Sequence, residues 1–108
     1  MKYLFSYIVL FCFQAVFAQQ AIRFESSSFN DILAKAKKEN KIVFLDAYAS
    51  WCGPCKLMEK NVFTDAKVAE YYNTNFVNAR IDMEKGEGVG IAQKFGIRSY
   101  PTYLFRSE

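Results

Sequence analysis

Two cysteines separated by two residues are the side chains of this sequence best suited to covalent chemistry. Cys52 and Cys55 follow an apolar run over 41–49, and residues 56–63 after them have the pattern of a helix. A thiol in the first turn of a helix faces unpaired backbone N–H groups and the positive end of the helix dipole, which lowers its pKa below the free value of about 8.5. The spacing therefore predicts that Cys52 is a nucleophilic thiolate.

The chemistry that such a pair supports is thiol–disulfide exchange. Cys52 would attack a substrate disulfide to form a mixed disulfide, and Cys55, one turn further into the helix, would attack Cys52 and release the reduced substrate. Pro54 suits the first turn of a helix, and Gly53 leaves room for the backbone of a partner. A purely structural disulfide is disfavoured, because a loop of about four residues removes little entropy from the unfolded chain.

Two other uses of the cysteine pair stay open at this point. Zinc sites also use Cys-X-X-Cys, but a structural zinc site needs four ligands and the sequence has no histidine, so zinc would require a second subunit. A pair of inert core thiols is the other alternative, and a position between the strand and the helix of a βαβ unit argues against it. We therefore expect no metal and no cofactor.

The composition indicates about one domain and excludes several function classes. The chain has 108 residues, of which 52% are hydrophobic, so there is ample material for a core. The absence of histidine excludes Ser-His-Asp and Cys-His catalysis. The net charge of +3 is spread along the sequence and forms no basic stripe, so nucleic acid is not an expected partner.

Residues 1–18 have the pattern of a secretory signal peptide. A basic start at Lys2 precedes an apolar run of 15 residues, and residues 16–18 offer small or modest side chains before the expected cleavage after Ala18. An uncleaved anchor is disfavoured, because spanning a bilayer takes about 20 apolar residues.

Cleavage would leave a domain over 19–108 in which Cys52 and Cys55 are the two cysteines, since Cys12 leaves with the signal. It would deliver this domain to an oxidising compartment, which we expect to be the periplasm, with no stable membrane insertion after cleavage.

Hydrophobic periodicity and capping residues predict the elements around the cysteines, after a polar lead-in over 19–25. Before the cysteines we expect a helix from Phe29 to about Asn40, with an N-cap among the serines 26–28, and a strand over 41–49. We then expect a helix from the cysteine pair to Phe63 and a further helical stretch that is capped by Thr64 or Asp65 and ends at 73–75. The last expected elements are a strand over 76–82, a short helix from Val89 to Phe95 closed by Gly96, and a strand over 102–105. This order predicts a βαβ-based α/β fold whose chemistry lies at the carboxyl ends of the strands.

The segment from Asp46 to Lys56, which includes Trp51 beside the cysteines, resembles the thioredoxin family, as does Tyr100-Pro101-Thr102 downstream. The resemblance covers roughly residues 29–105 and implies a three-layer α/β/α thioredoxin-like fold. It implies that Pro101 is a cis-proline beside the disulfide, which keeps metals from the cysteines. It also implies that the backbone of Tyr100 is exposed, so that an extended substrate peptide can pair with it as an added strand.

Two further residues match positions of that family. Asp46 matches its buried acid, which would move a proton on or off Cys55, and burial should raise the pKa of this acid toward that task. A solvated residue at a strand end is the alternative for Asp46. Trp51 matches the surface tryptophan beside the disulfide, and ordinary packing is its alternative.

The sequence departs from the family pattern at several places. Asn78 stands where the family usually carries a lysine opposite the buried acid, which would alter proton coupling at Asp46. The run Phe63-Thr64-Asp65 and the spacing of 49 positions from Cys52 to Pro101 are more similar to the secreted branch related to the periplasmic reductase domain of a membrane electron transporter. A complete thioredoxin fold continues past a strand such as 102–105 into another strand and a helix, so we expect a C-terminally incomplete domain.

The resemblance implies an exported thiol–disulfide oxidoreductase. We expect it to act mainly as a reductant, because Pro54 occupies the second spacer position, where oxidases and isomerases of the family more often carry histidine. Its expected partners are substrate proteins with disulfides and a membrane-bound or soluble thiol electron donor. The alternative is a non-catalytic thioredoxin-like binding module or an incomplete fragment of a larger oxidoreductase.

Overall fold

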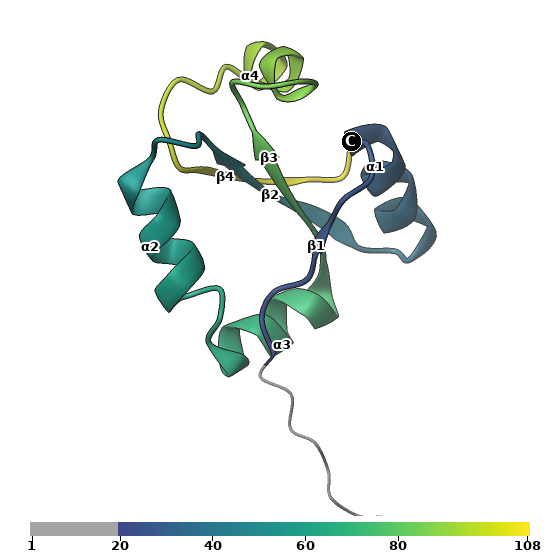
Figure 1. Cartoon of the computed structure of the whole chain (residues 1–108). Helices are drawn as coiled ribbons and strands as arrows, with labels where there is room; N and C mark the ends of the chain where they lie inside the picture. The colour runs from purple at the N-terminus through teal and green to yellow at the C-terminus, as the bar shows by residue number, and fades with distance from the viewer. Residues whose placement is uncertain (1–19) are drawn as a thin grey trace, which may run out of the picture.

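The computed structural model describes residues 20–108, which form a four-stranded sheet with helices on both faces (Figure 1). The elements in chain order are β1 (Phe24–Glu25), α1 (Phe29–Lys38), β2 (Ile42–Tyr48), α2 (Gly53–Asn61), α3 (Ala66–Asn75), β3 (Phe76–Asp82), α4 (Gly88–Phe95) and β4 (Thr102–Arg106). The strand order is β1-β3-β2-β4, in which β1, β2 and β3 are parallel and β4 runs antiparallel to β2. The expected signal peptide over 1–18 lies outside the described residues.

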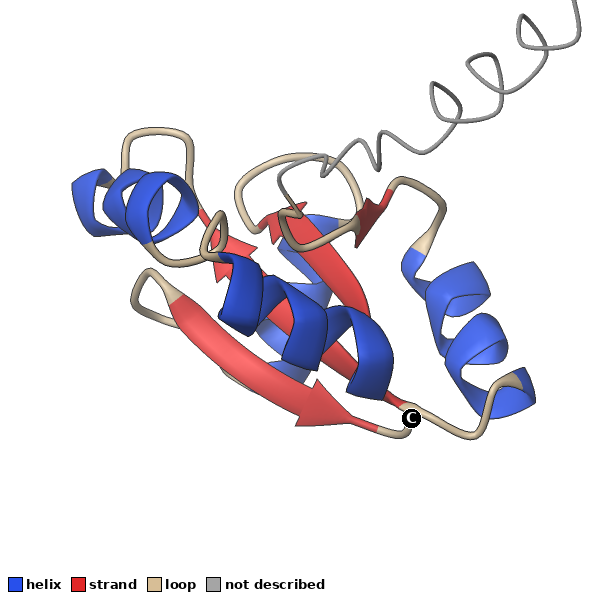
Figure 2. Ribbon diagram, turned by 90° about the horizontal axis from the view of Figure 1, so that it is seen from below, coloured by secondary structure: helices blue, strands red, loops and turns tan. Residues whose placement is uncertain are grey.

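The helices divide into two pairs, one on each face of the sheet. In Figure 1, α2 and α3 lie to the left of and below the strands, and α1 and α4 lie to the right of and above them. Figure 2 shows the strands between these helices, with the C-terminus just beyond the end of β4. The α/β architecture and its three layers agree with the sequence-based prediction.

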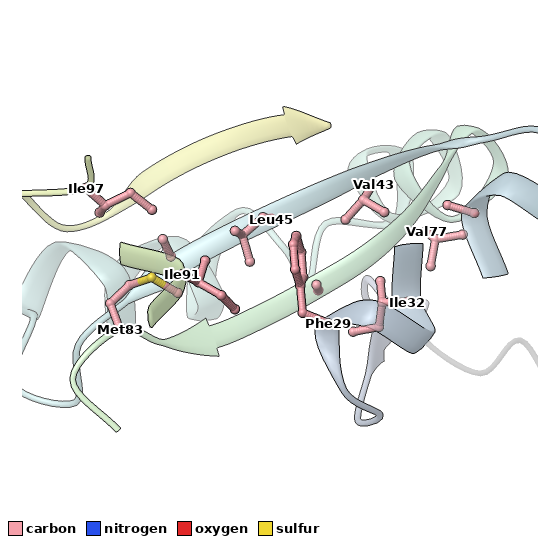
Figure 3. Packing of buried hydrophobic residues seen from close by; sticks show 11 residues of the cluster. Phe29, Ile32, Val43, Leu45, Val77, Met83, Ile91 and Ile97 are labelled. Carbon is pink, nitrogen blue, oxygen red and sulfur yellow. The ribbon is translucent and has the colours of Figure 1, made fainter. Parts of the chain in front are cut away.

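Side chains of the central strand β2 point alternately to the two faces of the sheet, and each face carries a hydrophobic core. Val43 and Leu45 are fully buried toward α1 and α4, and the next residues along the strand point to the opposite face, as the period of two requires. In Figure 3, Phe29 and Ile32 of α1 lie against these β2 side chains. The near-continuous apolar run of β2 is therefore explained by a strand that is covered on both faces.

The second core, between the sheet and α2 and α3, is aromatic. Phe44 is its buried centre: its ring centroid lies 4.8 Å from that of Tyr72, 5.7 Å from that of Tyr103 and 5.2 Å from that of Phe105. These rings hold α3 and β4 against β2, the strand that leads into the cysteine pair.

The predicted helix boundaries are largely confirmed. The hydroxyl of Ser28 caps α1 by accepting from the backbone N–H of Asp31, and Asp65 caps α3 by accepting from two backbone N–H groups. Gly96 ends α4 in the left-handed conformation, with φ 66°, which glycine adopts without steric cost. The helix at the cysteines ends at Asn61, two residues before the predicted end at Phe63.

Strand β1 is absent from the sequence-based prediction, which treats residues 19–25 as a polar lead-in. Its two residues are too few to show a period of two, and long-range contacts hold the segment in place. The backbone N–H of Ile22 donates to the carbonyl of Phe63, and that of Arg23 donates to Oδ1 of Asn73. Within residues 20–108, no helix is long and apolar enough to cross a membrane.

Candidate functional site

The cysteine pair lies at the carboxyl end of β2, where the chain turns into α2. Cys52 is the N-cap of α2 and forms a disulfide with Cys55, and the two Cα atoms are 5.3 Å apart. The backbone N–H of Cys55 donates to Sγ of Cys52 at 3.1 Å. Pro54 occupies the first turn, where its missing N–H leaves no helix hydrogen bond unmade. The disulfide therefore lies at the helix N-terminus, as the sequence predicts.

The disulfide is buried against aromatic side chains, whereas the two residues between the cysteines are exposed. Both cysteines are 2% exposed and pack with Ala49, Tyr48 and Tyr100. Gly53 and Pro54 are exposed beside them.

The loop before β4 reaches this site from the other side. Its Tyr100–Pro101 peptide bond is cis, as the family resemblance implies. The Tyr100 ring lies in an edge-to-face arrangement with the ring of Trp51, and their centroids are 5.9 Å apart. Side chains from two separate segments, at 48–49 and at Tyr100, thus pack around the disulfide, and Tyr100 also contacts Trp51.

Trp51 is 67% exposed, so ordinary core packing does not explain it. Its indole Nε1–H donates to Oε1 of Glu84 at 2.7 Å, which fixes the ring while leaving much of its surface in solvent. Glu84 is a residue that the sequence-based prediction missed. It belongs to a loop between β3 and α4, and no local pattern connects it with the cysteines.

Asp46 is a buried acid in the middle of β2. It is 1% exposed, so the alternative of a solvated strand end is wrong. Burial raises the pKa of Asp46 to about 6; the positive charge of Arg80 opposes this rise and the negative charge of Glu59 adds to it. Oδ1 of Asp46 has no hydrogen-bond partner among the described residues.

Arg80 is the second functional candidate that the sequence-based prediction missed. It pairs with Asp46 in the parallel register of β2 and β3, and its Nε is 3.7 Å from Oδ2 of Asp46. Its NH2 group donates to Oε2 of Glu59 at 2.6 Å, and its Cζ lies 3.8 Å from the centroid of the Tyr48 ring. Alternation along β3 puts 76, 78 and 80 on one face, so the period places Arg80 on the face of Asp46 but does not choose between 78 and 80 as its partner.

The departure from the family pattern suggests that Asn78 stands opposite the buried acid, but in the structure Asn78 does not face Asp46. It pairs with Phe44 rather than with Asp46, and its amide Nδ2 donates to the carbonyl of Tyr72 at 3.2 Å. The cation that faces the buried acid is therefore supplied by Arg80, two residues further along β3.

Metal binding finds no support in the donor set of the part of the chain that the structure describes. No group of three or more Cys, Asp, Glu or His side chains there is placed to hold a metal ion. The two sulfurs are bonded to each other.

The sequence matches known proteins over most of the described residues. A model of the thioredoxin-like family matches residues 23–106. Thioredoxin-1 of Drosophila yakuba is 40% identical over 67 residues, which cover 62% of this chain and 58% of that protein. The thiol:disulfide interchange protein DsbD of Yersinia pestis is 38% identical over 71 residues, which cover 65% of this chain and 12% of that protein. The chain thus spans little more than half the length of the thioredoxin that it matches.

Solved structures of similar shape confirm the predicted fold. A candidate disulphide-isomerase from Bacteroides thetaiotaomicron superposes with a TM-score of 0.72 and 48% identity, over 82% of this chain and 73% of that chain. A thioredoxin from Thermus thermophilus superposes with a TM-score of 0.70 over 79% of this chain and 64% of that chain, and at 24% identity it supports the fold alone.

Proposed function

Because this chain belongs to the thioredoxin-like family, we propose that it is a thiol–disulfide oxidoreductase that works through Cys52 and Cys55. One observation carries this proposal: a disulfide closes at the N-terminus of α2, with open surface beside it at Gly53 and Pro54. A partner can approach the pair there, as exchange requires. A disulfide that served stability alone would need no such access.

In the reducing direction, the pair transfers two electrons to a substrate. The thiolate of Cys52 attacks one sulfur of the substrate disulfide, that bond breaks, and the departing sulfur takes up a proton. The deprotonated sulfur of Cys55 then attacks Sγ of Cys52. The mixed disulfide breaks, the second substrate sulfur leaves as a thiol, and the chain is left with its own disulfide. A dithiol electron donor resets the pair by the reverse steps.

The N-terminus of α2 stabilises the attacking form of Cys52. In the disulfide state, Sγ of Cys52 already accepts from the backbone N–H of Cys55 at 3.1 Å. The same donor, together with the positive end of the helix dipole, favours a thiolate at this position.

We assign to Asp46 the role of accepting the proton of Cys55. Resolution of the mixed disulfide requires Cys55 to lose its proton, and a carboxylate with a pKa of about 6 is mostly ionised at pH 7 and can accept it. Burial supports this role, because it brings the pKa of Asp46 close to the working pH.

Substrate peptides are expected to bind beside the disulfide at the surface formed by Trp51, Gly53, Pro54, Tyr100 and Pro101. An extended peptide would pair with the backbone of Tyr100 as an added strand, and Trp51 would offer an apolar face to its side chains. The exposure of Trp51 next to a buried disulfide supports this assignment. The residue Pro54, in place of histidine, favours the reducing direction.

The test of the reaction is reduction of insulin disulfides by the chain with dithiothreitol as donor. Cys52→Ser should abolish the acceleration, and Cys55→Ser should accumulate mixed disulfides that identify the substrates. Ser27→Ala, at an exposed position before α1, is the control and should leave the rate unchanged. Equal rates for Cys52→Ser and the unmodified chain would rule the reaction out and favour a non-catalytic binding module.

The reducing direction has its own test. Equilibration with glutathione buffers gives the reduction potential of the Cys52–Cys55 couple. We expect a value well below that of a strong oxidant, which is about −120 mV. A couple as oxidising as that would overturn the assignment as a reductant.

We also propose that the chain is exported to the periplasm. The signal-like pattern of residues 1–18 supports it, as does the similarity to DsbD. Expression in a Gram-negative host, followed by fractionation and mass spectrometry, should find a periplasmic chain that begins at Gln19. A full-length product in the cytosol would contradict export without bearing on the reaction.

A further inference from the structure

The side of α2 that faces away from the sheet carries exposed side chains that the exchange reaction described above does not use. In Figure 1, α2 lies at the left edge of the molecule. Its outer face is formed by Gly53, Lys56, Leu57 and Lys60, which are three or four residues apart and all exposed. This outer face begins at Gly53, beside the disulfide, so it continues the surface on which a substrate is expected to bind.

Leu57 is the apolar part of the outer face. It is 60% exposed, and among the large apolar side chains within residues 20–108 only Trp51, at 67%, is more exposed. A single exposed leucine needs no explanation, whereas neighbouring exposed apolar side chains mark interaction sites. Trp51 and Leu57 come before and after the exposed pair Gly53 and Pro54 along the chain. Leu57 therefore extends the apolar substrate surface by one turn of α2.

The outer face is also basic. Lys56 and Lys60 are one turn apart, and within residues 20–108 neither of them forms an ion pair. Glu59, the one acid of α2, is bonded to Arg80 of the sheet. The outer face thus presents two ammonium groups beside Leu57, and no carboxylate of α2 neutralises them.

Helix stability does not explain this pair of lysines. Lys60 is in the last turn, where a cation interacts favourably with the helix dipole, but Lys56 lies near the other end of α2, where the dipole favours no cation. Two like charges four residues apart also destabilise a helix by repulsion. The pair therefore has a better explanation in the binding of an acidic partner.

We infer that the outer face of α2 determines substrate specificity: Leu57 receives an apolar side chain of the substrate protein, and Lys56 and Lys60 receive acidic side chains next to it. This inference rests on the proposed function, since it extends the substrate surface at Trp51 and Pro54. The substrates selected in this way are proteins in which an apolar and acidic segment lies close to the disulfide.

The dimensions of the outer face suit a short segment of the substrate. From Pro54 to Lys60 the helix rises by about 9 Å. About three residues of an extended peptide cover this distance. A segment that passes over Pro54 can therefore reach Leu57 and Lys60 within its next few residues. Exposed ion pairs are individually weak, so we expect a preference of several-fold for acidic substrates and not an absolute selection.

The experiment compares two peptides that share one disulfide-closed ring and differ in the residues on both sides of it, Leu-Glu-Glu in one and Leu-Lys-Lys in the other. The chain, first reduced with dithiothreitol and then freed of it, is mixed with each peptide, and loss of the peptide disulfide is followed by mass spectrometry. The Leu-Glu-Glu peptide should be reduced several-fold faster. This preference should shrink at high salt, which screens exposed charges.

Replacement of the two lysines tests the charged part of the surface. Lys56→Gln/Lys60→Gln should bring the rates for the two peptides to within about twofold of each other. The matched control is Lys37→Gln/Lys38→Gln, which removes two exposed lysines at the end of α1, before the end of β2 that lies opposite to the cysteines. This control should keep the full preference.

Replacement of Leu57 tests the apolar part. Leu57→Ala should lower kcat/KM for both peptides by about three- to tenfold, because less apolar surface is buried on binding. The loss should appear in KM and not in kcat, since Leu57 does not touch the reacting sulfurs. Ile42→Ala is the matched control, because Ile42 is 45% exposed at the start of β2, and it should leave both constants unchanged.

A small neutral disulfide, dithiodipyridine, separates this inference from the proposed function. A chain that reduces dithiodipyridine but reduces the two peptides at equal rates, or prefers the Leu-Lys-Lys peptide, would overturn the inference and leave the proposed function intact. Unchanged KM in Leu57→Ala would remove Leu57 from the surface.

A chain that reduces no disulfide at all would contradict the proposed function, and the surface is then tested by binding alone. The oxidised chain is titrated with both peptides after serine has replaced their cysteines. The Leu-Glu-Glu peptide should shift the backbone amide resonances of residues 53–61, and the Leu-Lys-Lys peptide should not. Equal shifts, or none, would overturn the inference.

Discussion

Asp46 and Arg80 face each other across the β2–β3 register, with Oδ2 and Nε 3.7 Å apart and no hydrogen bond between them. The buried acid of this fold is thus neither neutralised by a tight ion pair nor exposed to water. Burial outweighs the attraction of the cation, which is why the pKa of Asp46 is raised to about 6 and not lowered. At neutral pH the folded chain carries a buried charge at some cost in stability.

Replacing Asp46 should stabilise the protein in a pH-dependent way. The pKa of the group is raised in the folded state, so its contribution is most favourable below the unfolded value of about 3.9 and is lost as pH rises through about 6. Asp46→Asn should therefore have nearly the stability of the unmodified chain at pH 4 and exceed it by about 2 kcal/mol at pH 8. Urea unfolding of the oxidised proteins at both pH values measures this.

The control for this experiment is Asp31→Asn, which changes an exposed acid in the first turn of α1. Its effect on stability should be no more than about 1 kcal/mol at either pH. A gain for Asp46→Asn of the same size at both pH values would contradict a raised pKa at this position.

Local patterns were sufficient to predict most of the fold. The apolar run of β2, the caps at Ser28 and Asp65, and the terminating glycine at 96 each follow from interactions within a few residues. The cysteine pair and its place at a helix N-terminus follow from the same kind of signal, as does the burial of Asp46, which has apolar neighbours on both sides in the sequence.

The residues that sequence reasoning missed depend on contacts between distant segments. Glu84 reaches Trp51 from a loop 33 residues away, and Arg80 reaches Glu59 over 21 residues. Strand β1 is held by pairing with β3, some 54 residues along the chain. The register of β2 against β3 decides whether residue 78 or 80 faces Asp46, and a single sequence does not fix that register.

Glu84→Ala should loosen Trp51 without unfolding the protein. The indole would lose its hydrogen-bond acceptor but keep its contact with Tyr100, so stability should fall by less than about 1 kcal/mol. Trp51 is the only tryptophan of the chain, so time-resolved fluorescence anisotropy reports directly on its motion. KM for a protein disulfide should rise, because a mobile ring must be ordered on binding. Glu84→Gln keeps an accepting oxygen and should behave like the unmodified chain; equal anisotropy in Glu84→Ala would contradict the role of this contact.

Phe44→Ala should be among the most destabilising substitutions on the α2–α3 side of the sheet. Phe44 is buried and its ring meets those of Tyr72, Tyr103 and Phe105, so truncation leaves a cavity and removes several aromatic contacts. We expect a loss of about 3–5 kcal/mol in the free energy of unfolding. Phe105→Ala is the matched comparison, since that ring is 49% exposed and should cost clearly less. Equal losses in urea unfolding would show that Phe44 is not the centre of this core.

Two glycines in α4 should respond to alanine with opposite signs. A Cβ at Gly88 would overlap the backbone carbonyl of Asp82 at the end of β3, and backbone cannot move aside cheaply. Gly88→Ala should therefore destabilise the chain by about 1–3 kcal/mol. A Cβ at Gly90 meets nothing within 4 Å, so Gly90→Ala should stabilise the helix by about 1 kcal/mol through its higher helix propensity. Urea midpoints of both variants, measured in the oxidised state, decide this: a stabilising Gly88→Ala would mean that α4 does not pack this closely against the end of β3.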